Sequence, residues 1–170
     1  MPKKLPVSIT LDEFKRLMKN TKKKHHKVAF LLAFASGLRV SEVINLKPNE
    51  IDFKEKRILI LNGKGGKDRI VPLPKSFRQE LLKYIPIKIT TRSLQRAFKT
   101  AAKKAGILKI KPDAHFHSLR HGFATQCLKR GMSLQDTRFF LGHSNISTTS
   151  IYLHSEPKEA LGKYEELFGW

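Results

Sequence analysis

Side chains that could cleave a phosphodiester lie in four short segments of the sequence. In chain order they are Arg39, Lys64, His117, Arg120, His143 and Tyr152. Cleavage without a metal needs cations for the nonbridging phosphate oxygens, removal of a proton from the attacking hydroxyl, and donation of a proton to the leaving oxygen. The set contains residue types for each of these tasks.

The two arginines suit the nonbridging oxygens, because a guanidinium donates paired hydrogen bonds and stays charged at any working pH. A single arginine in a basic chain is more often a solvated surface charge. Arg39, however, lies in Gly37-Leu38-Arg39-Val40-Ser41-Glu42, at a predicted tight turn between two apolar helices. Glu42, three residues on, can hold a neighbouring basic group.

His117, Arg120 and His121 are three and four residues apart, so they share one face of a predicted helix. His117 can therefore reach the same phosphate as Arg120, whereas the pattern assigns no role to His121. A zinc site of His115, His117 and His121 is the competing interpretation. Zinc motifs with this spacing carry a glutamate between the histidines, and the adjacent Arg120 would repel a cation. We therefore expect neither a metal nor a cofactor.

The remaining candidates have ordinary alternatives when each is taken alone. Lys64 lies in a predicted Gly-rich hairpin tip that also holds Lys67, and it could be a solvated turn residue. A phosphate-binding P-loop is poorly supported, because the Lys-Ser/Thr ending and a following helix are missing. His143 could simply be stabilised by a helix C-terminus. A tyrosine such as Tyr152 is usually a core aromatic, as expected for Tyr84 and Tyr164.

Together and in this order, these segments resemble the tyrosine recombinase family, which includes phage integrases and Xer-type recombinases. The resemblance runs from about residue 8 to the C-terminus, and all the active positions of the family are occupied. It implies that Tyr152 is the nucleophile, that His143 donates a hydrogen bond to the phosphate, and that Lys64 is the general acid. Lys67 is the alternative general acid.

The implied function is site-specific DNA recombination through a 3′-phosphotyrosyl intermediate. A 5′-hydroxyl from a partner duplex would reverse the first step without ATP. Two other classes remain open: a type IB topoisomerase that uses the same tyrosine chemistry to relax supercoils, and a noncatalytic DNA-binding module. The six occupied positions argue against the second of these.

Composition points to the same partner. The 34 Lys and Arg against 14 Asp and Glu give a net charge of +20, which favours double-stranded DNA as the partner. No apolar run approaches the roughly 20 residues of a membrane span, and no apolar signal-peptide core follows the basic N-terminus. The single Cys127 excludes an intramolecular disulfide framework, and it is expected to be a buried helical residue. We therefore expect a cytoplasmic, DNA-associated protein.

The expected fold is α+β and mainly helical, similar to the tyrosine recombinase catalytic domain, with a small three-stranded antiparallel sheet. The predicted strands are 51–53, 57–61 and 69–73. The first predicted helix begins at the Thr10–Glu13 capping box. Further helices are predicted over about 25–36, from 41 for a short segment, and over 74–84, 91–104 and 118–129. The last three are a helix capped by Ser133 and Asp136, a short helix near Thr148, and a helix over 157–168.

The sequence predicts one catalytic domain over residues 1–170, and the family's N-terminal core-binding domain is absent from it. This absence should weaken site-specific binding and assembly of a tetramer on DNA. The last predicted helix has an apolar side formed by Leu161, Tyr164, Leu167, Phe168 and Trp170. The resemblance allows this helix to pack into a neighbouring protomer, and packing on its own domain is the equal alternative.

Overall fold

The computed structural model describes residues 6–61, 68–142 and 156–168. Three of the sequence-predicted site residues, Lys64, His143 and Tyr152, lie outside these ranges. So do Lys67, Trp170 and the helix predicted near Thr148.

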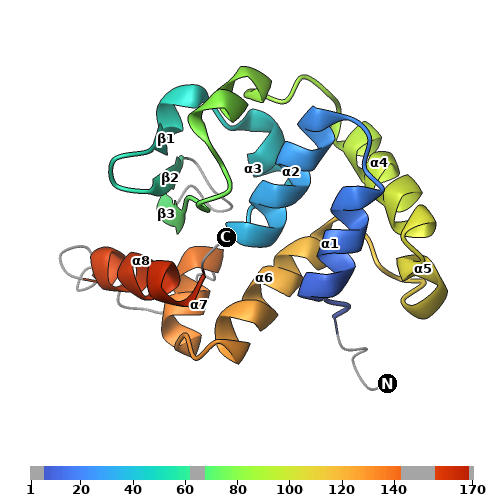
Figure 1. The fold of residues 1–170 in the computed structure, drawn as a ribbon. Helices are drawn as coiled ribbons and strands as arrows, with labels where there is room; N and C mark the ends of the chain where they lie inside the picture. The colour runs from blue at the N-terminus through green and yellow to red at the C-terminus, as the bar shows by residue number, and fades with distance from the viewer. Residues whose placement is uncertain (1–5, 62–67, 143–155, 169–170) are drawn as a thin grey trace.

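The described part of the chain is mainly helical, with a small sheet at one side (Figure 1). Its helices are α1 (Leu11–Lys19), α2 (Lys24–Ala35), α3 (Val40–Asn45), α4 (Thr91–Lys104), α5 (Ile107–Ile110), α6 (His117–Lys129), α7 (Leu134–Leu141) and α8 (Glu156–Leu167), with 3-10 helices η1 (Pro48–Glu50) and η2 (Gln79–Tyr84). The predicted fold class is confirmed.

The sheet has the order β1 (Ile51–Asp52), β2 (Arg57–Ile60) and β3 (Arg69–Pro72), and both pairings are antiparallel. Ile58 lies opposite Ile51 on one side and Val71 on the other, and all three are buried. This apolar row turns one face of the sheet toward the core. The three strands predicted from the sequence are therefore confirmed, with slightly shorter bounds.

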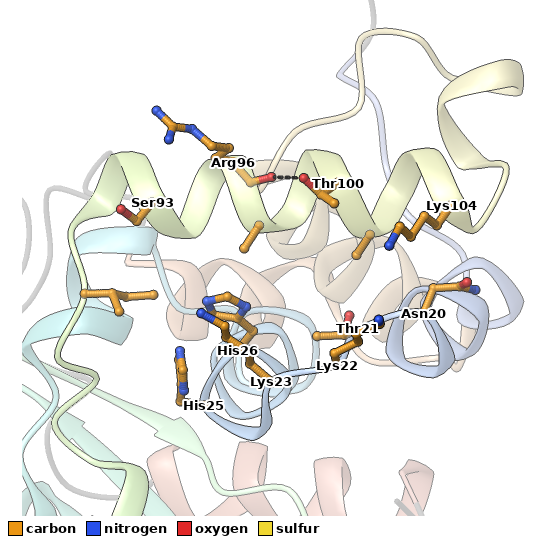
Figure 2. A pocket seen from close by; sticks show the side chains of 13 residues that line it. Asn20, Thr21, Lys22, Lys23, His25, His26, Ser93, Arg96, Thr100 and Lys104 are labelled. Carbon is orange, nitrogen blue, oxygen red and sulfur yellow. Dashed lines mark hydrogen bonds between the residues drawn. The ribbon is translucent and has the colours of Figure 1, made fainter.

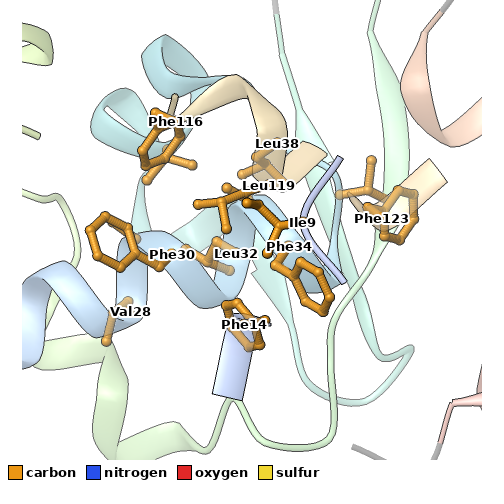
Figure 3. Close-up of a cluster of buried hydrophobic side chains, with 14 of the residues drawn as sticks. Ile9, Phe14, Val28, Phe30, Leu32, Phe34, Leu38, Phe116, Leu119 and Phe123 are labelled. Carbon is orange, nitrogen blue, oxygen red and sulfur yellow. The ribbon is translucent and has the colours of Figure 1, made fainter. Parts of the chain in front are cut away.

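Helices α2 and α6 pack against each other, and their buried side chains lie together in the hydrophobic core with residues such as Ile9 and Phe14 (Figure 3). Phe34 on α2 and Phe123 on α6 are each 1% exposed. A Cβ on Gly122 would lie 2.5 Å from the carbonyl oxygen of Ile9 and 2.8 Å from the Phe34 ring, so the glycine permits the close approach of α6. This packing fixes the C-terminal end of α2 against α6.

Local signals set most helix ends as predicted. The Thr10 hydroxyl accepts the backbone N–H of Glu13, and the Glu13 carboxylate accepts that of Thr10, which completes the capping box of α1. The Ser133 hydroxyl accepts the backbone N–H of Asp136 at the start of α7. These bonds satisfy N–H groups that have no partner within the helix.

Two helical segments differ from the predictions. The helix expected over 74–84 forms only in its second half: the chain makes turns and then the 3-10 helix η2, with Leu81 N–H bonded to the Arg78 carbonyl. The next residue, Ile85, is extended and precedes Pro86, a position that disfavours α-helix. Gly106, with φ 73°, ends α4 as predicted, but the one-turn helix α5 follows because Ile107 returns at once to the core.

Helix α8 packs against its own chain. Ala160, Tyr164 and Phe168 are buried, and the Tyr164 hydroxyl donates a 2.6 Å hydrogen bond to the Ala35 carbonyl at the end of α2. Tyr164 also contacts the rings of Phe123 and Phe140. The core role predicted for Tyr164 is confirmed, and Tyr84 is partly buried against the core. Within the described ranges, no helix is long and apolar enough to cross a membrane.

Candidate active site

The turn between α2 and α3 places Arg39 beside the core. Gly37 has φ 70°, and a Cβ there would lie 2.6 Å from the Phe123 ring, so this tight turn requires glycine. Arg39 then occupies the N-cap position of α3. The Glu42 carboxylate accepts both its backbone N–H, at 2.7 Å, and its Nη1, at 3.0 Å. The sequence prediction that Glu42 holds a neighbouring basic group is therefore confirmed.

Arg69 is a site residue that the sequence reasoning missed. It is the first residue of β3, and its Nη1 and Nη2 donate to the two carboxylate oxygens of Glu42 at 2.7 and 2.8 Å. Its Nε donates to the Phe140 carbonyl at 2.8 Å. The side chains of Arg69 and Glu42 are only 6% and 9% exposed. Arg69 therefore joins the sheet, the start of α3 and the end of α7.

Arg120 reaches the same place from α6. Its side chain is 4% exposed, its Nη1 donates to the Gly37 carbonyl at 2.6 Å, and its Nη2 donates to the Leu141 carbonyl. Its Nη1 lies 3.9 Å from a carboxylate oxygen of Glu42. The two carbonyls fix the guanidinium at the junction of α2, α6 and α7.

The charges at this junction do not balance. Within the described ranges, Arg39, Arg69 and Arg120 have Glu42 as their shared carboxylate, which leaves an excess of two positive charges. Burial alone would raise the pKa of Glu42, but hydrogen bonds and charge from Arg69, with hydrogen bonds from Arg39, lower it to about 2. Burial, together with repulsion from Arg39 and Arg69, lowers the pKa of Arg120 to about 9. Glu42 and Arg120 are therefore both charged at neutral pH, and the excess of arginines over carboxylates at the junction attracts an anion.

Two histidines extend the site along α6. The ring centroids of His117 and His121 are 4.7 Å apart, so the predicted shared face is confirmed. Burial, and then repulsion from His121, Arg120, His115 and Arg39, lower the pKa of His117 to about 4. His117 is therefore neutral at pH 7. It can donate a hydrogen bond from one ring nitrogen and accept one at the other.

The metal alternative can be compared with the geometry. Among the residues that the structure describes, no three His, Cys, Asp or Glu side chains are arranged to hold a metal ion. Cys127 is buried on α6, and burial raises the pKa of its thiol to about 12. This agrees with the predicted structural role of Cys127.

We expect protonation of His117 to lower the stability of the fold in acid. Its pKa is below the ordinary 6.5 in the folded protein, so the unfolded chain binds more protons between pH 6.5 and about 4. The contribution of His117 is complete above pH 6.5 and decreases as the pH falls through this window. Urea denaturation of the wild type and of His117→Gln, from pH 7 to pH 4, measures the difference.

The variant should lose less stability than the wild type between pH 6.5 and 4. His115 is exposed, and His115→Gln is the matched control. Identical dependence of stability on pH in the wild type and His117→Gln would contradict the expectation that folding keeps the His117 ring neutral.

Comparison with known proteins places this arrangement in a family. Residues 8–159 match the phage integrase family. The chain is 35% identical over 170 residues to tyrosine recombinase XerA of Pyrococcus horikoshii, in an alignment that covers 89% of this chain and 58% of that protein. It is 34% identical to a tyrosine recombinase of Thermosipho africanus, with 97% of this chain and 63% of that protein covered. The chain thus spans about three-fifths of the length of these relatives.

Solved structures agree with the sequence comparison. The integrase from mycobacterium phage Brujita has a TM-score of 0.81 and 25% identity, and the match covers 98% of this chain and 60% of that one. A XerA recombinase structure has a TM-score of 0.67 and 28% identity, and the match covers 96% of this chain and 65% of that one. The fold, the family match and the resemblance of the candidate segments all agree, and the chain belongs to the phage integrase family of tyrosine recombinases.

Proposed function

We propose that this chain is the catalytic domain of a site-specific recombinase that cleaves and rejoins double-stranded DNA. The observation that carries the proposal is the junction of three arginines around Glu42, with neutral His117 beside it. Such a site has excess positive charge before any ligand binds. It suits a phosphate whose negative charge increases in the transition state.

Arg120 and Arg39 are the proposed ligands of the nonbridging oxygens. Two of the five N–H donors of Arg120 bind backbone carbonyls, which orients the guanidinium and leaves others for a phosphate. Arg39 is 22% exposed, which leaves it accessible to a ligand. All three guanidinium nitrogens of Arg69 already donate hydrogen bonds, Nη1 and Nη2 to Glu42 and Nε to the Phe140 carbonyl. We therefore propose that Arg69 holds Glu42 and the end of α7 in place.

His117 is proposed to donate a hydrogen bond to the same phosphate, because it shares the helix face of Arg120. His121 packs against His117 at the edge of the site, and we propose that it positions that ring. The roles of Lys64, His143 and Tyr152 rest on the sequence resemblance. Gly142, which immediately precedes His143 in the sequence, lies against Arg69, because a Cβ there would be 2.9 Å from Arg69 Cδ.

The proposed cleavage step conserves bond energy. The Tyr152 hydroxyl gives its proton to the unprotonated ring nitrogen of His117, its oxygen attacks the phosphorus atom, and the bond from phosphorus to the 5′-oxygen breaks. Lys64 gives that oxygen its proton, with Lys67 as the alternative donor. The product is a 3′-phosphotyrosyl bond and a free 5′-hydroxyl, and the same hydroxyl from a partner duplex reverses the step.

We further propose that the domain assembles as a tetramer on DNA and that residues 1–170 act as one catalytic domain. Exchange of α8 between protomers would need the Tyr164 bond to Ala35 and the ion pair of Lys56 with Glu165 to break. The first of these is buried and the second is exposed. The free-energy cost of releasing α8 from its own domain would therefore come mainly from the loss of the buried aromatic contacts of Tyr164 and Phe168.

We expect a covalent adduct to form when the protein meets nicked duplexes in which the sequence around the nick is randomised. The nick lets the 5′-hydroxyl fragment diffuse away and traps the phosphotyrosyl bond. The adduct should appear on a denaturing gel even in EDTA, because arginines and histidines supply the charge stabilisation that a metal would otherwise give. Sequencing of the trapped DNA would give the target site.

Two results would contradict this proposal. Adduct formation that is lost in EDTA and restored by zinc would instead support the histidine metal site. Relaxation of supercoiled plasmid without strand exchange between two duplexes would instead indicate type IB topoisomerase activity.

A further inference from the structure

The chain passes across the start of α6 just before it forms α1. Ile9, two residues before α1, donates its backbone N–H to the Ser118 carbonyl at 3.1 Å. A Cβ on Gly122, one turn further along α6, would lie 2.5 Å from the Ile9 carbonyl oxygen. The backbone at Ile9 therefore packs directly on two successive turns of α6. We call residues 8–10 the entry segment.

The entry segment lies on the side of α6 opposite Arg120. Successive residues of an α-helix are rotated by about 100° around its axis, so Ser118 and Gly122 share one side and Arg120 lies about 180° from them. The His117 ring projects between these two sides. A shift of the entry segment would therefore change how far α6 extends Arg120 and His117 into the active site.

Lys111 holds the entry segment in this place. Its Nζ donates to the Ser8 carbonyl at 2.8 Å and to Oε2 of Glu13 at 2.7 Å. The same Glu13 oxygen accepts the backbone N–H of Thr10 at 2.8 Å. Lys111 is thus bound directly to the residue before Ile9 and, through Glu13, to the residue after it.

These contacts are partly shielded from water. The side chains of Lys111 and Glu13 are 25% and 8% exposed, and Ile9 is buried in the core cluster (Figure 3). Burial alone would raise the pKa of Glu13, but hydrogen bonds from Lys111 and Thr10 and the charge of Lys111 lower it below its ordinary value. Glu13 is therefore ionised at neutral pH, and the bond from Lys111 is charge-assisted.

The backbone of Lys111 belongs to the segment that leads into α6. Its N–H donates to the Ile107 carbonyl at 2.8 Å, and its carbonyl accepts the N–H of Ala114 at 3.0 Å. Ala114 is buried, and α6 begins three residues later at His117. The contacts therefore form a closed ring, which runs from the Lys111 side chain through the entry segment to Ser118 and back along the chain to Lys111.

We propose that Lys111 is a positioning residue, which holds the entry segment on α6 and thereby fixes His117 and Arg120 in the geometry that binds the phosphate. Its Nζ donates to the entry segment and to Glu13, so it acts on the active site through α6. The inference rests on the proposed function in taking His117 and Arg120 as phosphate ligands. Its structural part can be measured without DNA.

Lys111 is separate from a basic pocket of the domain. This pocket, about 450 Å³ in volume, lies between α4 and the turn after α1, and its lining includes Lys22, Arg96 and Lys104 (Figure 2). Lys111 does not line it, and the entry segment lies at the opposite end of α1, whose 9 residues span about 13 Å. Replacing Lys111 should therefore leave this basic surface unchanged.

The test compares Lys111→Met with Lys109→Met. Both changes remove one lysine charge from the same region and keep a linear side chain, but Lys109 is exposed and makes no ion pair within the described ranges. The double variant Lys111→Met/Glu13→Gln covers the case in which the single variant does not fold. It leaves no unpaired carboxylate, and the amide oxygen can still accept the Thr10 N–H.

The first measurement is an NMR titration of the His117 ring, identified by its absence in His117→Gln. Burial is the largest cause of its low pKa, so loosening α6 in Lys111→Met should raise the pKa above the wild-type value of about 4. The charges that lower it belong to His121, Arg120, His115 and Arg39. Lys111 is not among them, so loss of its charge alone should not move the pKa, and Lys109→Met should titrate as the wild type does.

Amide hydrogen exchange supplies a second measurement without DNA. The Ile9 N–H is protected by its bond to the Ser118 carbonyl. It should exchange faster in Lys111→Met and in the double variant, and at the wild-type rate in Lys109→Met.

The third measurement is the rate of adduct formation on the nicked substrate, with saturating protein that urea curves show to be folded. The rate should fall by about tenfold or more in Lys111→Met and in the double variant, because a misplacement of about 1 Å can cost about a hundredfold. Kd for an intact duplex should change no more than in Lys109→Met. Ile58→Val, which destabilises the buried side of the sheet, should keep the wild-type rate.

Unchanged His117 titration and Ile9 exchange in both Lys111 variants would overturn the proposal. So would an equal fall in rate in Lys109→Met or Ile58→Val, since the effect would then come from charge or stability alone. A shifted His117 pKa with an unchanged rate would overturn it as well. If the wild type forms no adduct, the proposed function fails, and titration and exchange decide by themselves whether Lys111 holds α6.

Discussion

Replacing Tyr152 by phenylalanine is expected to abolish the covalent protein–DNA adduct while DNA binding persists. The change removes one oxygen atom, the proposed nucleophile, and keeps the aromatic ring. Binding depends mainly on lysine and arginine contacts to phosphates, which the substitution does not alter. The measurements are adduct formation on the nicked substrate and Kd for an intact duplex.

The other two tyrosines are the controls. Tyr164→Phe leaves the Ala35 carbonyl without its hydroxyl donor, which should cost about 1 kcal/mol of stability, but the adduct should still form. Tyr84→Phe should have little effect, because this side chain packs at the edge of the core. An adduct that survives Tyr152→Phe and disappears in either control would move the nucleophile to that control residue.

Short-range signals predicted much of the fold correctly. The capping boxes, the glycine turns and the apolar spacing act over three or four residues, so they can be recognised in a single sequence. This is why the starts of α1 and α7 and both ends of α2 lie within one or two residues of their predicted positions. The prediction for 74–84 was wrong in the first half, where the chain makes turns, and Phe77 and Ile85 are buried on either side of the 3-10 helix η2, a tertiary constraint that local spacing does not show.

The candidate site was predictable only in part. The three-residue spacing placed His117 and Arg120 on one face, and Glu42 was expected to hold a basic group. Arg69 was missed because its partners, Glu42 and Phe140, are 27 and 71 residues away in the sequence. No local pattern marks such contacts. The carbonyl ligands that orient Arg120 are hidden for the same reason, since they depend on how helix ends meet.

Removal of the Glu42 carboxylate is expected to give the largest loss of stability among the described site residues. Glu42→Ala leaves Arg69 and Arg120, both nearly buried, without their shared countercharge. Breaking a buried ion pair by removing one partner typically costs about 3–5 kcal/mol. Urea denaturation at pH 7 measures the loss. The loss should shrink as the pH falls from 4.5 toward 2, because Glu42 of the unfolded wild-type chain takes up a proton in this window and the folded carboxylate does not.

Glu50→Ala separates the role of the cap from that of the charge. The Glu50 carboxylate accepts the backbone N–H of Lys47 at 2.7 Å, as Glu42 does for Arg39, but its hydrogen bond is exposed. Loss of such a cap should cost only about 1 kcal/mol. A similar loss in Glu50→Ala and Glu42→Ala would show that capping, and not the arginine junction, makes Glu42 important.

A double-mutant cycle then tests whether Glu42 and Arg69 act together. Glu42→Leu/Arg69→Met replaces the pair with apolar side chains, so no charge of the pair remains buried. The double variant should be less destabilised than the sum of its single variants by about 1–3 kcal/mol. Additive losses would mean that Arg69 stabilises the domain mainly through the Phe140 carbonyl. In that case the link between β3 and α7 would not depend on Glu42, and the excess positive charge at Arg39 and Arg120 would be held in place by other contacts.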